Sequence, residues 1–134
     1  MIRVYVDMVG DLFHVGHLNM FKQARTYGDY LIVGIHSDKT VKSYKRTPII
    51  KQEDRYQIIA NCKLVDQIIE NAPLKITHDF ILNNNIHYVV HGDDLNTKST
   101  EMMYSIPIKL GIMKTIPYTK GISTTKIINK IKQI

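Results

Sequence analysis

Residues 2–17 read IRVYVDMVGDLFHVGH, and this stretch decides the fold of the chain. Its first five residues are rich in β-branched and aromatic side chains, which predicts an opening strand over 2–6. After a polar segment, apolar residues recur at helical spacing over 16–27, and Gly28 follows as a C-cap. A strand, a polar loop and a helix in this order indicate the first unit of an α/β sheet.

The rest of the chain repeats the alternation of strand and helix. Residues 30–35, YLIVGI, form a continuous apolar run, as a parallel strand covered on both faces requires. Further strands are expected over 64–69, 87–90 and 112–116, and further helices over 52–61, 78–82, 100–110 and 123–131. Pro107 should kink or shorten its helix, and Ser123 or Thr124 should cap the last one. We therefore expect an α/β fold with a parallel sheet and right-handed crossovers, with ligands bound beyond the carboxyl ends of its strands.

Length and composition limit the class of protein. The chain has 134 residues, of which 44% are hydrophobic and 22% charged, as in one globular domain and unlike a disordered chain. No apolar run approaches the ~18 residues of a membrane span, and the start lacks a signal-peptide pattern. Cys62, the single cysteine, excludes an internal disulfide framework and a cysteine-cluster metal site. A reducing, cytoplasmic location fits these features.

The charge balance is basic, with 18 Lys and Arg against 12 Asp and Glu. Such an excess suits nucleic acid, anionic lipid or small phosphorylated ligands, but it is also the mark of an ordinary solvated surface. The basic residues are scattered and do not interleave with aromatic ones, so no nucleic-acid partner is expected.

Two glycine-containing segments lead into predicted helices, at 14–17 (HVGH) and at 118–125 (YTKGISTT). A helix N-terminus offers unpaired N–H groups and a partial positive charge, which together bind anions. Imidazoles can also donate hydrogen bonds to phosphoryl oxygens. Taken alone, HVGH could instead cap a helix or bind a metal, and the second turn could be a chance glycine turn. Together in one small α/β domain, they predict a polyphosphate lying between two helix openings.

Several motifs occur in the order known from one family: DLFHVGH at 11–17, GDYLIVGIHSD at 28–38, QEDRY at 52–56, VD at 65–66, NAP at 71–73, HGDD at 91–94 and GIST at 121–124. Over nearly its whole length the chain resembles the cytidylyltransferases of the H-x-G-H nucleotidyltransferase superfamily, above all the ethanolamine-phosphate and choline-phosphate types. The resemblance implies a Rossmann-like, doubly wound parallel sheet forming a single nucleotidyltransferase domain over 1–134. It also implies transfer of CMP from CTP to a phosphomonoester, with Mg²⁺ as cofactor, release of pyrophosphate and a role in phospholipid head-group activation.

The resemblance also assigns residues to this reaction. His14 and His17 would stabilise the transition state, and Lys45 would neutralise a phosphate. The residues expected to bind CTP are Val9, Gly10, Asp11, Gly16, Lys63, Gly92, Asp94, Thr119, Gly121, Ile122, Ser123 and Thr124. The chain is not expected to supply a metal-ligand cluster of its own.

Two positions depart from the family pattern. Met8 stands where the first loop usually has glycine, and the glycine occurs at Gly10 instead. Tyr118 replaces the arginine that precedes the G-I-S-T turn, so a bidentate phosphate donor is lost. Lys120, nearby in sequence, is expected to compensate.

The substrate is expected to be a phosphorylated amino alcohol. Asp7, Tyr104 and Arg55 match substrate-side positions of the family. Asp7 could instead simply cap a strand end, Tyr104 could be a core residue, and Arg55 and Asp66 could simply pair in an ion network. The choline-type enzymes have aromatic residues where this chain has Leu74 and Thr97, and the chain contains no tryptophan. Because a quaternary ammonium favours an aromatic cage, we expect phosphoethanolamine before phosphocholine, with glycerol 3-phosphate third.

Other hypotheses remain open at this point. Met8 and Tyr118 also suit a non-catalytic CTP-binding module, and an adenylyltransferase of the same superfamily is a further alternative. Relatives of this type are commonly homodimers with their 63–66 region near the interface. The chain ends at Ile134 without the lipid-binding segment or second domain of some relatives, so lipid regulation through this chain is not expected.

Overall fold

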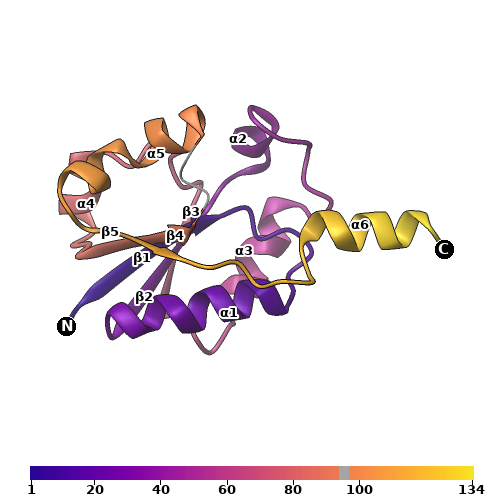
Figure 1. Cartoon of the computed structure of the whole chain (residues 1–134), viewed down its shortest axis with the longest axis horizontal. Helices are drawn as coiled ribbons and strands as arrows, with labels where there is room; N and C mark the ends of the chain where they lie inside the picture. The colour runs from indigo at the N-terminus through magenta and orange to yellow at the C-terminus, as the bar shows by residue number, and fades with distance from the viewer. Residues whose placement is uncertain (94–96) are drawn as a thin grey trace.

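The computed structural model of the protein describes residues 1–93 and 97–134, and it is built on a parallel sheet (Figure 1). The strands are β1 (Arg3–Met8), β2 (Tyr30–Ile35), β3 (Gln67–Glu70), β4 (Tyr88–Gly92) and β5 (Met113–Ile116). They lie in the order β3-β2-β1-β4-β5, and all neighbouring pairs are parallel. The predicted doubly wound α/β fold is confirmed. The chain fills one side of β1 first and then the other, so the strand order reverses between β1 and β4, where such sheets open a ligand crevice.

Helices cover both faces of this sheet. They are α1 (Val15–Ala24) with a following 3₁₀ turn η1 (Arg25–Tyr27), α2 (Asp38–Lys42), α3 (Gln52–Ala60), α4 (His78–Asn83), α5 (Lys98–Lys109) and α6 (Thr124–Lys132). In Figure 1, α1 and α3 lie on one side of the sheet and α4 and α5 on the other, whereas α6 points away from the body toward the C-terminus. Among the described residues, no helix has both the length and the apolar character needed to cross a membrane.

Side chains of β1 alternate between two hydrophobic cores. Val4 and Val6 lie in a core with side chains of α1 and α3. Tyr5, between them, lies in the opposite core with Ile81 of α4 and Tyr104 of α5. This period-two alternation is what a strand covered on both faces requires. Packing on both sides therefore holds the carboxyl end of β1 in place.

The third strand is shorter than predicted. β3 begins at Gln67, because residues 64–66 belong to a turn whose groups bond to the side chain of Arg25. Arg25 Nη1 donates to the Leu64 carbonyl over 3.0 Å and to the Asp66 carboxylate over 2.7 Å. The sequence pattern extended the strand too far because Leu64 and Val65 are apolar, as strand residues are.

The polar segment after β2 contains α2, a helix that the sequence pattern does not predict. Ser37 caps it, since its Oγ accepts the Thr40 N–H over 3.1 Å. A helix of five residues is too short to show a helical period, so its cap is the main local signal.

Pro107 does not shorten α5, which continues to Lys109. Proline has no N–H, so the Met103 carbonyl one turn earlier loses its partner in the helix. That carbonyl accepts the Ile76 N–H over 3.0 Å instead. A tertiary contact thus replaces the hydrogen bond that proline removes.

Candidate functional site

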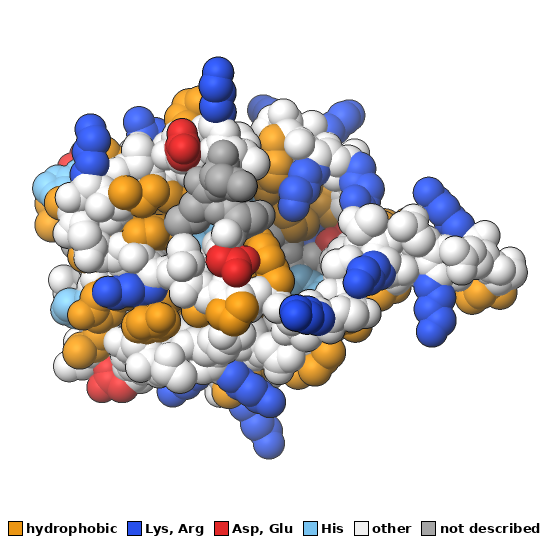
Figure 2. Space-filling model, in the orientation of Figure 1, with side chains coloured by type: hydrophobic (Ala, Val, Ile, Leu, Met, Phe, Trp, Pro, Cys, Tyr) orange, Lys and Arg blue, Asp and Glu red, His pale blue; other side chains and the backbone are white. Residues whose placement is uncertain are grey.

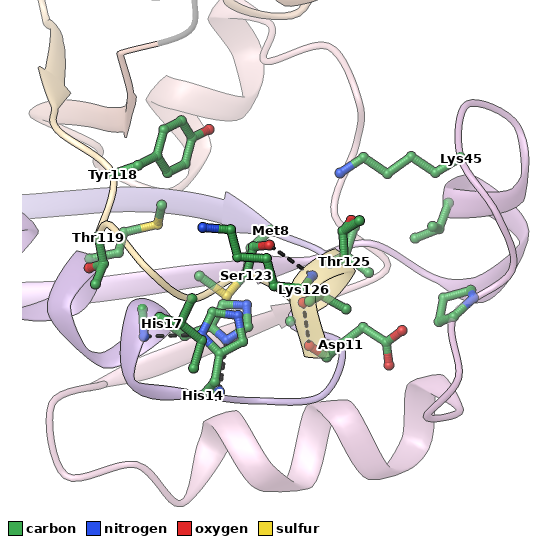
Figure 3. A pocket seen from close by; sticks show the side chains of 18 of the residues that line it. Met8, Asp11, His14, His17, Lys45, Tyr118, Thr119, Ser123, Thr125 and Lys126 are labelled. Carbon is green, nitrogen blue, oxygen red and sulfur yellow. Dashed lines mark hydrogen bonds between the residues drawn. The ribbon is translucent and has the colours of Figure 1, made fainter. Parts of the chain in front are cut away.

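A pocket of about 720 Å³ opens at the carboxyl ends of β1 and β4 (Figure 3). Its walls come from the end of β1 and the opening of α1, from the segment between α2 and α3, from His91 of β4, and from residues 118–126. This volume lies within the range of small-molecule binding sites. The pocket lies where the sheet topology predicts it.

Two hydrogen bonds join the opening of α6 to that of α1. Thr124 Oγ1 donates to the Asp11 carbonyl over 3.0 Å. Asn19 Nδ2 donates to Thr119 Oγ1 over 3.1 Å. The two glycine-containing turns, far apart in sequence, therefore lie against each other and border the same pocket, as predicted.

The two helix openings at the pocket lack acidic residues. α2, α3, α4 and α5 each have an Asp or Glu in the first turn, whereas α1 and α6 have none. A carboxylate in the first turn offsets the positive end of the helix dipole. Without it, that charge and the unpaired N–H groups are available to a bound anion.

The histidines of the HVGH turn both cap α1 and face the pocket. Nδ1 of His14 accepts the Gly16 N–H over 3.0 Å, and Nδ1 of His17 accepts the His14 N–H over 3.1 Å. A nitrogen that accepts carries no proton, so each neutral ring has its proton on Nε2. The ring centroids are 4.0 Å apart. The capping interpretation is therefore correct, but it uses only one nitrogen of each ring and keeps Nε2 as a donor.

Both imidazoles are neutral near pH 7. Burial lowers the pKa of His17 from its ordinary 6.5 to about 4, and the neighbouring His14 lowers it further while Asp11 opposes the shift. Burial also lowers the pKa of His14 below its ordinary value. Neutral rings can lie this close together without charge repulsion, and each offers one N–H to a ligand.

Asp11 acts on the backbone around the pocket. Its two carboxylate oxygens accept the N–H groups of Ile49 and Ile50, both over 2.9 Å, which anchors the segment between α2 and α3. Gly10, just before it, has a φ of +71°. A Cβ at Gly10 would lie 2.5 Å from Ile59 Cδ1 of α3. Glycine at this position is thus required by the turn and by packing against α3.

A buried carboxylate lies at the floor of the pocket, at the end of β1. Asp7 Oδ1 accepts a hydrogen bond from the Tyr104 hydroxyl over 2.6 Å, and that hydroxyl lies 3.1 Å from His91 Nδ1. Asp7 Oδ2 has no hydrogen-bond partner among the described residues, and neither has His36 Nε2, which lies 3.6 Å from it. Burial, then the Asp7 charge, raises the pKa of Tyr104 far above its ordinary value, so its hydroxyl remains a donor. The Tyr104 ring belongs to the core while its hydroxyl orients Asp7.

The model of the cytidylyltransferase-like family matches residues 10–130 of this chain. The chain belongs to that family. The ethanolamine-phosphate cytidylyltransferase of Dictyostelium discoideum is 41% identical over 133 residues, which are 96% of this chain and 37% of that protein. The choline-phosphate cytidylyltransferase A of Rattus norvegicus is 33% identical over 133 residues, 97% of this chain and 36% of that protein. This cytidylyltransferase-like chain therefore spans little more than a third of the length of these curated relatives.

Solved structures share the fold of this cytidylyltransferase-like chain. The lipopolysaccharide core biosynthesis protein from Thermoplasma volcanium is 28% identical, with a TM-score of 0.69 over 87% of this chain and 94% of that one. A pantothenate synthetase from Thermus thermophilus is 14% identical with a TM-score of 0.55, over 87% of this chain and 56% of that one, and shows the fold alone.

Most residues that the resemblance assigns to the reaction lie in the pocket lining. They are Asp7, Val9, Gly10, Asp11, His14, Gly16, His17, Lys45, Thr119, Gly121, Ile122, Ser123 and Thr124. The lining also holds Met8, Tyr118 and Lys120, the positions singled out as departures and compensation. Two pocket residues were not predicted. His91 lies in the HGDD motif but was not assigned to the site. Lys126 could have been found as a cation three residues after Ser123, the cap of the last helix. No pattern pointed to Arg46, which lines the pocket beside Lys45.

Arg55 needs a correction, because it is a positioning residue that lies outside the pocket lining. Its side chain is fully buried, with donations to the carbonyls of Val9 (2.5 Å), His36 (2.9 Å) and Ile50 (2.9 Å) and to Asp38 Oδ1 (2.7 Å). These bonds occupy most of its N–H groups, so little remains for a substrate. Arg55 and Asp66 do form ion pairs, but not with each other: Arg55 pairs with Asp38, and Asp66 pairs with Arg25.

Lys63 also lies away from the pocket. It is exposed in the turn between α3 and β3, at the amino end of a parallel strand, whereas the pocket opens at the carboxyl ends. Within one chain it does not border the site. Asp94, the other outlying position, is outside the residues that the structure describes.

Gly92 contributes to the pocket indirectly, through Tyr118. A Cβ at Gly92 would collide with the Tyr118 ring, so the ring lies directly over the last residue of β4. Tyr118 is half exposed and forms part of the pocket wall. Where the family pattern has an arginine, this chain therefore has an aromatic wall packed on glycine.

Proposed function

We propose that this chain transfers CMP from CTP to a phosphorylated amino alcohol, phosphoethanolamine in preference, and releases pyrophosphate. Its family membership supports cytidylyl transfer, and the relatives named above include enzymes named for ethanolamine phosphate and for choline phosphate. The observation that carries the choice of substrate is the buried Asp7 carboxylate at the pocket floor.

Asp7 suits a primary ammonium group. A buried carboxylate is costly unless charge and hydrogen bonds compensate it. Its Oδ2 lacks a donor among the described residues, and His36 Nε2 beside it lacks a partner as well. A primary ammonium brings one positive charge and three N–H donors. A quaternary ammonium has no N–H and gains most from an aromatic cage, and glycerol phosphate has no cation at all.

In the proposed reaction an oxygen of the substrate phosphate attacks the α-phosphorus of CTP. A new P–O bond forms while the bond between the α-phosphorus and the bridging oxygen breaks, and its electron pair leaves with pyrophosphate. Charge is spread over the phosphoryl and leaving oxygens in the transition state. His14 and His17 would donate their Nε2–H groups to these oxygens from positions that the capping bonds already hold, as preorganised donors do.

The triphosphate would be held by cations and helix openings. Lys45 lines the pocket on the wall across from the imidazoles and would neutralise a phosphate from that side. Among the described residues, no group of three or more His, Cys, Asp or Glu side chains is placed to hold a metal ion. We therefore propose that Mg²⁺ arrives on the triphosphate and offsets its charge, since Mg²⁺ is usually held by substrate phosphates with few protein ligands.

The test is a pyrophosphate-release assay with CTP and, in parallel, phosphoethanolamine, phosphocholine and glycerol 3-phosphate. We expect phosphoethanolamine to give the highest kcat/KM. Turnover of phosphocholine alone would overturn the substrate assignment. Binding of CTP without pyrophosphate release from any of the three would show a non-catalytic module, and preference for ATP would show an adenylyltransferase.

Asp7→Asn tests the ammonium site directly. It keeps the shape of the side chain but removes its charge, so kcat/KM for phosphoethanolamine should fall by about 10²-fold. The KM for CTP should change little, because the triphosphate contacts lie elsewhere in the pocket. An equal loss for glycerol 3-phosphate would contradict a role for Asp7 in binding ammonium.

We also propose that the protein is a cytoplasmic homodimer that uses residues 63–66. Leu64 and Val65 are partly exposed apolar side chains at the edge of the core, which suits an interface. Light scattering of the wild type and of Val65→Asp tests this, with a dimer expected for the first and a monomer for the second. Cell fractionation tests the location.

A further inference from the structure

The last helix begins with a cation in an unfavourable place. Lys126 is the third residue of α6, and its N–H donates to Ser123 Oγ over 3.1 Å. The N-terminal turn of a helix carries partial positive charge, which repels a lysine there. Where α2 and α5 have a lysine in the first turn, an acidic residue accompanies it, but α6 has none. In the free protein the helix dipole therefore opposes the charge of Lys126.

The ammonium of Lys126 has no carboxylate partner among the described residues. The ion pairs among the described residues join Arg25 to Asp66, Arg55 to Asp38 and His36 to Asp7. The Asp11 carboxylate, which also lines the pocket, already accepts backbone N–H groups. The cations of the lining are Lys45, Arg46, Lys120 and Lys126, and its carboxylates are Asp7 and Asp11. The pocket thus has an excess of positive charge, to which Lys126 contributes.

Figure 3 shows how the two labelled lysines are directed. The Lys126 side chain runs from the start of α6 into the pocket on the side of the imidazoles, and the Lys45 side chain extends into it from the opposite wall. An extended polyanion between the two helix openings would therefore meet a lysine from each side. This arrangement turns an unfavourable charge in the free protein into a favourable one in the complex.

We propose that Lys126 binds the β- and γ-phosphates of CTP, the part that leaves as pyrophosphate. This inference rests on the proposed function and deepens it. The α-phosphate must lie at His14 and His17 to react, and Lys126 enters the pocket from the α6 opening on that same side, so the phosphates that follow the α-phosphate would lie within its reach. Lys126 thereby supplies the charge that is lost where Tyr118 replaces the family's arginine. Lys120 was expected in this role, but it lies in the turn before α6 and has no comparable position at a helix opening.

Lys126→Ala should separate stability from binding. The melting temperature of the free protein should rise by about 1–4 °C, because a repulsive contact with the helix dipole is removed. The increase in melting temperature caused by inorganic pyrophosphate should shrink by at least half, while that caused by CMP should persist. In the CTP assay, kcat/KM should fall by about 10–100-fold, as expected for a lost hydrogen bond between charged groups.

The matched control is Lys130→Ala, which removes the same charge one turn further along α6, outside the pocket lining. It should leave the pyrophosphate response and kcat/KM unchanged, and Lys126→Arg should retain most of both. Equal losses in the two alanine variants would overturn the proposal, because they would indicate only a general effect of net charge. It would also be overturned by an unchanged pyrophosphate response in Lys126→Ala, or by a loss confined to Lys120→Ala.

Failure of the proposed function would look different. A wild-type protein that releases no pyrophosphate from CTP with any phosphomonoester contradicts cytidylyl transfer. The binding of pyrophosphate and CMP is measured without turnover, so that comparison still decides whether Lys126 contacts the terminal phosphates.

Discussion

The openings of α1 and α6 face the same pocket but are built differently. α1 packs against the sheet, buries Phe21 and Ala24, and uses His14 and His17 as its own caps. α6 buries no residue and stands out from the rest of the surface, with basic side chains on either side of it (Figure 2). It joins the body through the turn before it and through the bond from Thr124 to the Asp11 carbonyl.

This difference separates two tasks. Groups that must match a transition state need a rigid surrounding, and the core supplies it at α1. A group that grips the leaving end of a polyanion needs charge more than rigidity, and an exposed helix opening is sufficient. We therefore expect changes at α1 to affect kcat most strongly and changes at α6 to affect the binding of the triphosphate.

The strongest test of this comparison is His17→Ala. It removes an Nε2 donor from the reacting centre and also the side chain that accepts the His14 N–H. We expect kcat to fall by about 10²–10⁴-fold, as when a positioned donor or acid–base group is lost. Steady-state kinetics measure this. His78→Ala, an exposed histidine at the start of α4, is the control and should remain fully active.

The second test measures how the stability of the folded protein depends on pH through His17, at the buried opening of α1. The pKa of His17 is about 4 in the folded protein and ordinarily 6.5, so the unfolded chain binds a proton more readily within this window. Stability is therefore complete above pH 6.5 and falls as the pH is lowered toward 4, by on the order of 2 kcal/mol from this residue. Urea unfolding at about pH 7.5 and about pH 4.5, on either side of most of this window, measures the loss. His17→Gln should reduce the loss, and an identical pH dependence in that variant would refute the assignment.

The smallest expected effect concerns the hydrogen bond from Thr124 to the Asp11 carbonyl, which connects the two helix openings. Thr124→Val preserves the shape of the side chain but removes the donor to the Asp11 carbonyl. Loss of one neutral hydrogen bond of about 1 kcal/mol should lower kcat/KM for CTP by about 5-fold and leave kcat nearly unchanged. Thr115→Val, an exposed threonine of β5, is the isosteric control. A fall in kcat as large as that of His17→Ala would mean that the two openings form one rigid unit.

Much of the fold follows from local patterns. The run YLIVGI matches β2 over Tyr30–Ile35, and Ser123, one of the two predicted caps, caps α6. Where the local signal misleads, a tertiary contact is responsible. Arg25 bonds to Leu64 and Asp66 in the turn before β3, and the Ile76 N–H supplies the partner that Pro107 denies to Met103. Neither contact has a sequence signature, because each joins residues that lie far apart in the chain.

The candidate site divides in the same way. The types and order of its residues, as in HVGH and GIST, could be predicted from the sequence, because the residues of each motif lie next to one another in the chain. The burial of Arg55 could not be predicted from the sequence. An arginine next to a predicted site has the same sequence pattern whether its side chain binds backbone carbonyls or a phosphate. Lys63 and Asp7 were both assigned to the site from sequence, but Asp7 lies at the carboxyl end of β1, whereas Lys63 lies in the turn before the amino end of β3.

The sequence by itself determined the parallel α/β fold, the two anion-binding helix openings and the family of the chain, because periodicity, capping and glycine turns act over a few residues. The tertiary structure alone decided which imidazole nitrogen is available to a ligand. It also decided that Asp7 has a buried oxygen without a partner among the described residues, and that Lys126 and Lys45 line the same pocket. These properties depend on distances between residues far apart in the chain, and such distances exist only once the sheet has brought the carboxyl ends of its strands together.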